Sequence, residues 1–263
     1  AVSKAMAGQK YVCHAAALVP GSGAVDSEFE RVNVGGTRTV CEAAVASGVS
    51  RLLHVSTVYV FGTQPGAFVD ENSTPPLTPH AGYDSSKVDA EAVVMAYVPK
   101  TLDAVIVNPA VVFGPRSRHS GRLIKLFLRR LLPAVPLPDR MLSLVYSGDV
   151  ARGVRLALEK GHPGERYILA GPSVTVRNFI NALARASGRR APRLALPEWL
   201  VTAAVSAAWS VSSVTRWKPP VTVDGIRRGG TLYDGSRAQK ELGLDYTPLE
   251  DSLTETVTWM QGR

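Results

Sequence analysis

The chain has 263 residues, of which 45% are hydrophobic and 20% are charged. This composition supplies enough apolar material for a packed core and excludes intrinsic disorder as the main state. Thirty Lys and Arg residues against 22 Asp and Glu residues give a net charge of +8, which favours anionic partners without identifying them. The two cysteines, Cys13 and Cys41, are too few for a disulfide framework and lack zinc-like spacing. We therefore expect a reducing, cytoplasmic compartment and no metal site.

Neither the first residues of the chain nor its longest uncharged run indicates a membrane segment. The first ten residues, AVSKAMAGQK, lack the apolar stretch of a secretory signal. The longest uncharged run, residues 199–215, is too short and too rich in Ser, Thr and Ala to span a bilayer. We expect a buried or half-buried helix there. The alternative is an interfacial helix anchored by Trp199, Trp209 and Trp217.

In the first half of the chain, short β-branched runs alternate with helical stretches, which is typical of βαβ units and a parallel sheet. A strand is expected at 11–13, and then a helix that Gly48 ends. The apolar face of that helix holds Val32, Val34, Val40, Ala43 and Ala44. Strands at 52–56 and 104–108 follow, separated by a long helix that begins near Tyr83.

Beyond Pro115 the pattern changes to loops and helices. We expect loops at PAVPLP (133–138) and ERYILAGPS (165–173). The helices are expected at 121–131, 149–160, 175–187 and 198–215. This part of the chain therefore predicts a smaller, mostly helical lobe that wraps on the sheet.

Tyr83 and Lys87 stand four residues apart at the start of a predicted helix, so that both side chains share one face. A neighbouring ammonium stabilises a phenolate and lowers the tyrosine pKa from its ordinary value of about 10. Such a pair can give or take a proton at a carbonyl or alcohol oxygen. The alternative is a solvated helix face, because this spacing also arises by chance.

Two hydroxyl side chains follow the predicted strand that ends at His54 and Val55, namely Ser56 and Thr57. Ligands of doubly wound sheets bind at the carboxyl ends of the strands, which is where these hydroxyls lie. The alternative is that they only satisfy local backbone groups at the end of the strand.

Five segments in this order resemble the extended short-chain dehydrogenase/reductase family. They are YVCHAAA (11–17), VNVGGTRTVCEAA (32–44), RLLHVSTVYVFG (51–62), YDSSK (83–87) and VNPAVVFGP (107–115). The family includes sugar-nucleotide epimerases and dehydratases, hydroxysteroid dehydrogenases and dihydroflavonol reductases. The resemblance implies an α/β fold with a Rossmann-like, doubly wound parallel sheet. Residues 1–115 would belong to the NAD(P)-binding domain and 116–263 to the substrate lobe, with segments at about 143–172 returning to the first domain.

The resemblance also implies roles for individual residues. Tyr83 would be the general acid/base, Lys87 would bind the nicotinamide ribose and lower the pKa of Tyr83, and Thr57 would hydrogen-bond the reacting oxygen of the substrate. The cofactor, NAD or NADP, would also be bound by a further set of residues. These are His14, Ala15, Ala16, Ser56, Pro109, Ala110 and Val111.

One landmark of the family is missing. No Gly-x-x-Gly-x-x-Gly segment opens a helix after a first strand, and Gly21-Ser22-Gly23 follows a later strand and lacks the third glycine. We expect that about 65 residues of the nucleotide-binding half are absent and that the chain is a fragment. The residue that selects between NAD and NADP would lie in that part.

The substrate side departs from the family at Asn108, Tyr146 and Gly148, where many relatives have Arg, His and an acid. We expect Asn108 to line the substrate cleft together with Arg116 and Arg122. The cations between Arg116 and Arg130 fit either an anionic substrate or a solvated basic face. No motif for nucleic-acid binding is present, and a weak contact with a membrane surface is the more plausible use of a basic patch.

The function that these features predict is NAD(P)-dependent oxidation or reduction of a secondary alcohol or ketone, a small-molecule substrate. The alternatives are a nucleotide-sugar epimerase or dehydratase and a truncated, non-catalytic remnant. The family resemblance also predicts a homodimer.

Overall fold

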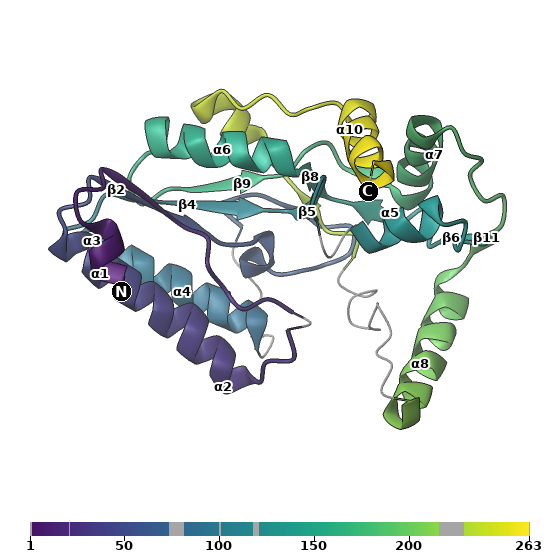
Figure 1. Ribbon diagram of the computed structural model, residues 1–263, viewed down its shortest axis with the longest axis horizontal. Helices are drawn as coiled ribbons and strands as arrows, with labels where there is room; N and C mark the ends of the chain where they lie inside the picture. The colour runs from purple at the N-terminus through teal and green to yellow at the C-terminus, as the bar shows by residue number, and fades with distance from the viewer. Residues whose placement is uncertain are drawn as a thin grey trace.

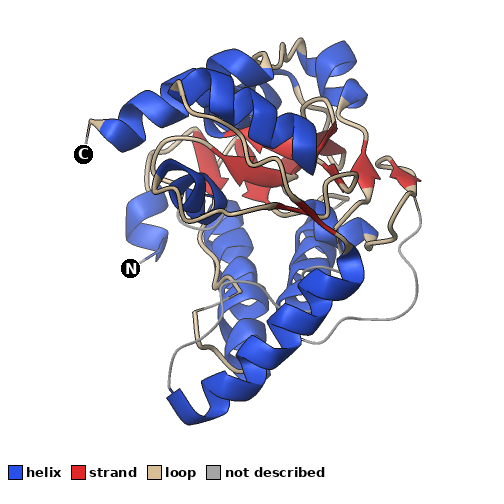
Figure 2. Cartoon of the chain, turned by 90° about the vertical axis from the view of Figure 1, so that its right-hand side faces the viewer, coloured by secondary structure: helices blue, strands red, loops and turns tan. Residues whose placement is uncertain are grey.

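The computed structural model describes residues 2–20, 22–73, 82–99, 101–117, 121–215 and 229–262. A parallel four-stranded sheet with the order β1-β2-β4-β9 runs through the molecule, and helices cover both of its faces (Figures 1 and 2). Its strands are β1 (Tyr11–His14), β2 (Arg51–Val55), β4 (Ala104–Pro109) and β9 (Arg166–Leu169). The predicted α/β fold with a parallel sheet is confirmed, as are the strands expected at 11–13, 52–56 and 104–108.

Strand β4 is the most deeply buried strand of the sheet. All six of its residues are buried, and it pairs in parallel with β2 on one side and β9 on the other. A strand covered on both faces reads as a continuous apolar run, which is why AVIV could be recognised in the sequence. Parallel pairing also brings the carboxyl ends of β1, β2 and β4 to the same edge of the sheet.

The face drawn below the sheet in Figure 1 is covered by the helices of the first hundred residues. They are α1 (Val2–Met6), α2 (Asp26–Phe29), η1 (Glu30–Gly35), α3 (Gly36–Ala46) and α4 (Tyr83–Tyr97). The buried side chains of α3 and α4 form one apolar cluster with Leu52 and Ile106 of the sheet. Gly48 has a φ of 64°, the left-handed conformation that ends the predicted helix.

The opposite face is covered by α6 (Ser147–Lys160) and η3 (Ala238–Leu242). Gly153 lies so close to the sheet that a Cβ atom there would come within 2.9 Å of the Leu169 methyl groups. The absence of a side chain thus allows α6 to lie directly on β9. Leu242 and Leu244 are completely buried and complete the apolar cluster on this face.

In the described part of the chain, four pairs of short strands lie outside the main sheet, and the short helix η2 (Val58–Phe61) follows β2. They are β5 (Val111–Phe113) with β8 (Leu144–Tyr146), β3 (Phe68–Val69) with β12 (Leu232–Tyr233), β7 (Met141–Leu142) with β10 (Val174–Thr175), and β6 (Val135–Pro136) with β11 (Ala195–Leu196). Helices α5 (Gly121–Leu128), α7 (Val176–Ser187) and α10 (Leu249–Gln261) pack around a cluster of their own. The predicted helices at 121–131, 149–160 and 175–187 are confirmed.

Both loops expected in the second half contain a short strand. Residues 166–169 form β9, because hydrogen bonding to β4 determines this segment, and Val135–Pro136 form β6. Helix α8 (Glu198–Thr215) exists as predicted and points away from the body of the molecule (Figure 1); among its described side chains, 198–210, five are half-buried and none is buried. No helix within the described ranges is both long and apolar enough to cross a membrane.

Candidate active site

Thr57 lies at the carboxyl end of β2, where the chain leaves the sheet and begins η2. Its extended backbone, with a φ of −156°, places its Oγ1 to accept a hydrogen bond from the Tyr59 N–H at 3.4 Å. The Ser56 N–H donates to the Val107 carbonyl at 2.8 Å, which continues the sheet pairing by one residue. Both hydroxyl residues are buried, and both lie at the sheet edge that the sequence predicted.

Tyr83 is the first residue of α4 and follows Gly82, whose φ is 80°. A Cβ atom at position 82 would come 2.9 Å from the Asp26 carboxylate, so a glycine is required for the chain to turn into the helix here. The Tyr83 ring packs edge-on against Phe29, with ring centres 6.1 Å apart. This packing holds the phenol on the side of α4 that faces β2.

The Tyr83 side chain lies beside Thr57. Burial, followed by the nearby Asp84 and Tyr59, raises the pKa of Tyr83 to about 12, and the Thr57 hydroxyl opposes this rise. The structure thus brings together two of the three predicted catalytic residues from segments 26 positions apart in the sequence.

Lys87 lies one turn further along α4 and is 2% exposed. Its Nζ donates to the Val55 carbonyl at 2.8 Å and lies 3.3 Å from His54 Nε2. Burial lowers the pKa of Lys87 to about 8, and the charge of Glu91 opposes this. An ammonium group has three protons, so one remains available for a further acceptor beside β2.

The expected effect of Lys87 on Tyr83 differs in this arrangement. The lysine Nζ is held against β2, and the groups that shift the pKa of Tyr83 are its burial, Asp84, Tyr59 and Thr57. The phenol is therefore held in its protonated form, whereas the sequence predicted a lowered pKa.

His14 ends β1 and lies next to His54, with ring centres 5.3 Å apart. Its Nε2 lies 3.1 Å from the Thr37 Oγ1, which donates to the Asn33 carbonyl at 2.6 Å. Burial and the charge of Lys87 lower the pKa of His14 to about 4, so its ring is neutral at physiological pH. Whether His14 touches a cofactor stays a prediction.

Asn108 occupies a place that differs from the predicted one. It is completely buried on β4, and its Nδ2 donates to the Thr57 carbonyl at 3.1 Å and to Glu91 Oε1 at 2.6 Å. Because the side chain lies beneath Thr57 and has no exposed surface, the geometry gives it a supporting role instead of the predicted direct contact with the substrate.

Glu91 is a residue of this site that sequence reasoning missed. It is 5% exposed, accepts from Asn108, and its Oε2 lies 3.6 Å from Arg166 Nη1. Burial raises the pKa of Glu91. Its spacing of four residues from Lys87 and eight from Tyr83 puts all three on the same side of α4, and that spacing could have identified it.

The remaining residues predicted to hold the cofactor lie at the same sheet edge. Ala15 and Ala16 follow β1 and are exposed, while Pro109 and Ala110 at the end of β4 are buried and Val111 is 41% exposed. Small side chains beyond β1 leave backbone accessible to a ligand. This placement fits the predicted cofactor contacts, which remain predictions.

The predicted substrate-side arginines are not brought together with Tyr83 by any described contact. Arg116 is exposed and has a φ of 64°. Arg122 lies in α5, but its side chain is outside the described part of the structure, as are Arg118, Gly21 and Trp217.

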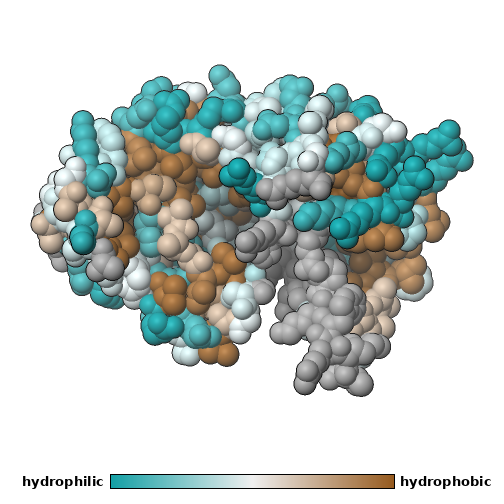
Figure 3. Space-filling view, viewed as in Figure 1, coloured by the Kyte–Doolittle hydropathy of each residue, from teal (hydrophilic) through white to brown (hydrophobic). Residues whose placement is uncertain are grey.

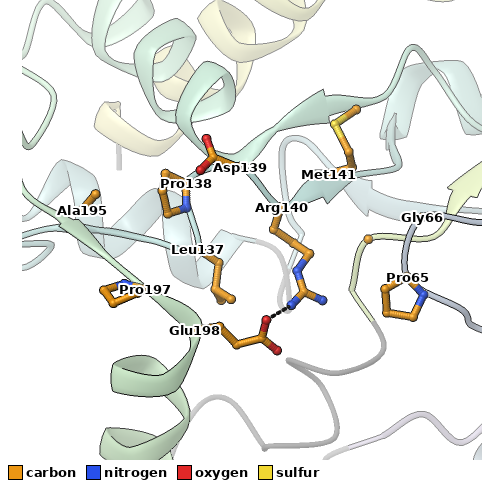
Figure 4. A pocket seen from close by; sticks show the side chains of 11 residues that line it. Pro65, Gly66, Leu137, Pro138, Asp139, Arg140, Met141, Ala195, Pro197 and Glu198 are labelled. Carbon is orange, nitrogen blue, oxygen red and sulfur yellow. Dashed lines mark ion pairs between the residues drawn. The ribbon is translucent and has the colours of Figure 1, made fainter.

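A cavity of about 620 Å³ lies in the second half of the molecule, between the segment after β6 and the start of α8 (Figure 4). The Arg140 side chain points into it, forms a 2.8 Å ion pair with Glu198 and donates to the Gly229 carbonyl at 2.8 Å. None of the predicted site residues lines this cavity. Arg140 has its hydrogen-bonding capacity engaged by the protein, so its charge is largely neutralised.

Comparisons with known proteins agree with the resemblance seen in the sequence. Residues 1–170 match the model of the NAD dependent epimerase/dehydratase family. The chain is 31% identical to sterol demethylase protein B of Methylococcus capsulatus in an alignment of 271 positions. This alignment covers 100% of this chain and 82% of that protein. The chain is also 32% identical over 250 residues to a 4-hydroxy-2-methyl-3-oxo-4-farnesyl-3,4-dihydroquinoline-1-oxide ketoreductase of Stigmatella aurantiaca, covering 92% and 74%.

Solved structures show the same relationship. The crystal structure of a double mutant of DesIV, a dTDP-glucose 4,6-dehydratase from Streptomyces venezuelae with NAD and DAU bound, superposes with a TM-score of 0.72 at 28% identity. The superposition covers 99% of this chain and 76% of that one. A family match over more than half of the chain, relatives above 30% identity and this shared fold lead to one conclusion. The chain belongs to the NAD-dependent epimerase/dehydratase family.

Proposed function

We propose that the protein interconverts a secondary alcohol and a ketone with NAD or NADP, using Tyr83 as the proton donor and acceptor. The observation that carries this proposal is the position of Tyr83 beside Thr57 at the carboxyl edge of the sheet, with the Lys87 ammonium bonded to the Val55 carbonyl one turn away along α4. A hydroxyl pair beside a buried cation is suited to bind and protonate a carbonyl oxygen.

The residues present at the sheet edge fit a nicotinamide cofactor. Lys87 retains one proton for a ribose hydroxyl, and the exposed backbone of Ala15 and Ala16 can approach the polar part of the cofactor. The other residues that we assign to cofactor binding are Ser56, Pro109, Ala110, Val111 and the neutral His14. When bound, the cofactor supplies or accepts the hydride.

The protein residues act on the proton and on the orientation of the substrate. Thr57 holds the reacting oxygen, and Tyr83 gives it a proton. Because the pKa of Tyr83 is raised to about 12, the phenol is protonated at neutral pH. This is the protonation state from which Tyr83 donates a proton when a ketone is reduced.

The similarity to a ketoreductase of Stigmatella aurantiaca supports this assignment. The second candidate is a nucleotide-sugar epimerase or dehydratase, which the similarity to a dTDP-glucose 4,6-dehydratase favours. In that case a hydride is taken from and returned to the same substrate, so that no net cofactor is consumed. The family resemblance also predicts a homodimer, which sedimentation equilibrium would test.

The test follows cofactor oxidation with a panel of ketones and with a nucleotide sugar. We expect net oxidation of NADH or NADPH by a ketone, and a loss of about 100-fold or more in kcat for Tyr83→Phe. Tyr97→Phe is the matched control, because Tyr97 lies at the far end of the same helix and should keep full activity.

Three results would overturn parts of this proposal. Conversion of the nucleotide sugar without net cofactor turnover would favour the second candidate. Unchanged turnover in Tyr83→Phe would remove Tyr83 from the mechanism. A folded protein that neither binds the cofactor nor turns over any substrate would support the non-catalytic remnant.

A further inference from the structure

A cationic surface lies at the end of the molecule opposite α1 and α3, where α5 ends and the chain leaves α7. We call it the basic surface, and it carries Lys125, Arg129, Arg130, Arg189, Arg190 and Arg193. One cavity of about 390 Å³ is lined by Lys125, Arg129 and Arg189, and an adjoining one of about 530 Å³ by Arg130, Arg189 and Arg190. Because Arg189 borders both cavities, five of these cations form one continuous cluster.

The basic surface lacks acidic partners. Residues 121–138 and 176–197, which carry all six cations, contain neither Asp nor Glu. Among the ion pairs of the described residues, none involves any of the six. Arg185 on the same helix, by contrast, pairs with Glu250 at 2.6 Å. A group of cations without counter-charges creates a positive potential that attracts an external anion.

Exposed leucines border the cations. Leu131 directly follows Arg130 and is 61% exposed, and Leu194 directly follows Arg193 and is 63% exposed. The two loops are joined, since the Val135 N–H donates to the Leu194 carbonyl at 2.8 Å. In Figure 3 hydrophilic residues project at the right-hand edge of the molecule, with hydrophobic surface directly beneath them.

This combination identifies the chemistry of the partner. Arginine-lined cavities suit phosphate groups, and aliphatic side chains beside them suit the acyl boundary of a bilayer. A nucleic acid would instead use exposed aromatic rings on which its bases stack. The aromatic residues lining the two cavities, Phe127 and Trp259, are buried and half-buried.

We propose that the basic surface docks the protein on a membrane containing anionic phospholipids. Phosphodiester headgroups occupy the two arginine-lined cavities, and Leu131 and Leu194 enter the interface. The proposal does not depend on the chemistry at Tyr83, because none of that site's residues belongs to this surface.

The test is co-sedimentation of the full chain with vesicles of phosphatidylcholine, with and without phosphatidylglycerol. We expect binding only to the anionic vesicles, and weaker binding as salt is added. The double variant Arg129→Gln, Arg130→Gln should lower the affinity about 30-fold, on the basis of about fivefold for each charge near a membrane surface. The matched control is Arg31→Gln with Arg38→Gln, which removes the same charge from two exposed positions on the opposite helices and should change the affinity less than about twofold.

A second pair of variants separates membranes from other polyanions. Leu131→Ser with Leu194→Ser keeps every charge, so it should weaken vesicle binding and leave the binding of an oligonucleotide unchanged. All six substituted positions are exposed, and an unchanged midpoint of thermal unfolding verifies that each variant is folded.

The proposal fails if binding to phosphatidylcholine alone is equally strong, or if the control pair weakens binding as much as the arginine pair. It also fails if the leucine pair has no effect while an oligonucleotide displaces the vesicles, because the surface would then be a nucleic-acid site.

Discussion

Asn108 and Glu91 form a buried polar pair, and the Asn108 amide donates a hydrogen bond to the Thr57 carbonyl. We predict that Asn108→Ala lowers the free energy of unfolding by about 1–3 kcal/mol, because it leaves the Thr57 carbonyl and the Glu91 carboxylate without this donor. It should also lower kcat, since Thr57 loses an anchor next to Tyr83. Urea unfolding and steady-state kinetics measure both effects. Asn72→Ala, at an exposed asparagine, is the control and should change stability by less than about 0.5 kcal/mol; equal effects of the two variants would contradict the supporting role.

His14 gives the site a pH dependence whose sign follows from its lowered pKa. The folded value is about 4 and the ordinary value is 6.5, with burial as the main cause. Between these values the unfolded chain binds more protons than the folded one, so stability is lost as the pH falls from 6.5 towards 4. We predict that His14→Gln flattens this part of the curve of melting temperature against pH. Parallel curves for the two proteins would show that His14 does not contribute.

The positions of Tyr83 and Lys87 on one helix and of Thr57 at the end of a strand could be predicted from the sequence, because helix spacing and the end of a parallel strand are local signals. The position of Asn108 could not be predicted in the same way. Its side chain lies beneath Thr57 because β4 and α4 pack together, and this contact joins Asn108 to a helix residue 17 positions earlier. The raised pKa of Tyr83 likewise depends first on its burial, to which the packing of Phe29 contributes and which the Tyr-x-x-x-Lys spacing does not contain, and then on Asp84, which lies within that spacing.

At the scale of elements, Tyr146 and Gly148 at the start of α6 are in steric contact, so the residue at one position limits the other. The Tyr146 ring is buried and lies over Gly148, where a Cβ atom would come within 2.5 Å of Tyr146 Cε1. The Tyr146 ring in this position leaves no room for a side chain at residue 148, which accounts for the glycine there.

We predict that Gly148→Ala destabilises the protein by about 1–3 kcal/mol, because the added methyl group overpacks the start of α6. Tyr146→Val removes the ring, so the same Gly148→Ala change should then cost little. A double-mutant cycle measured by urea unfolding should give a coupling energy of at least about 1 kcal/mol. Additive effects would mean that the ring moves aside without cost.

Long elements with a clear periodicity were predictable from the sequence, including α4, α7 and strands β1, β2 and β4. Strand β9 was not, because turn-forming Gly and Pro flank it on both sides and it forms by pairing with β4 over a long separation in the chain. For α8 the sequence left burial and half-burial open. Only the arrangement of the whole molecule shows that none of its first 13 side chains is buried and that some are half-buried.

At the scale of the whole molecule, alternating strand residues join the three apolar clusters. On β4, Val105 and Val107 belong to the cluster beneath α6, and Ala104 and Ile106 to the one beneath α3 and α4. On β8, Val145 belongs to the first of these, while Leu144 and Tyr146 belong to the cluster of α5, α7 and α10. Because β4 and β8 each contribute side chains to two of the clusters, we expect the molecule to unfold as one cooperative unit.

The four tryptophans make this expectation measurable, since they lie at positions 199, 209, 217 and 259 and none lies in the first half of the chain. Leu53→Ala removes a completely buried side chain of β2 and should cost about 2–5 kcal/mol. If the sheet and the helical lobe unfold together, this change in the sheet lowers the urea midpoint of tryptophan fluorescence as much as that of far-UV circular dichroism. A fluorescence midpoint that stays at the wild-type value would instead show that the helical lobe unfolds on its own, because the contacts through Val145 would then be too weak to couple it to the sheet.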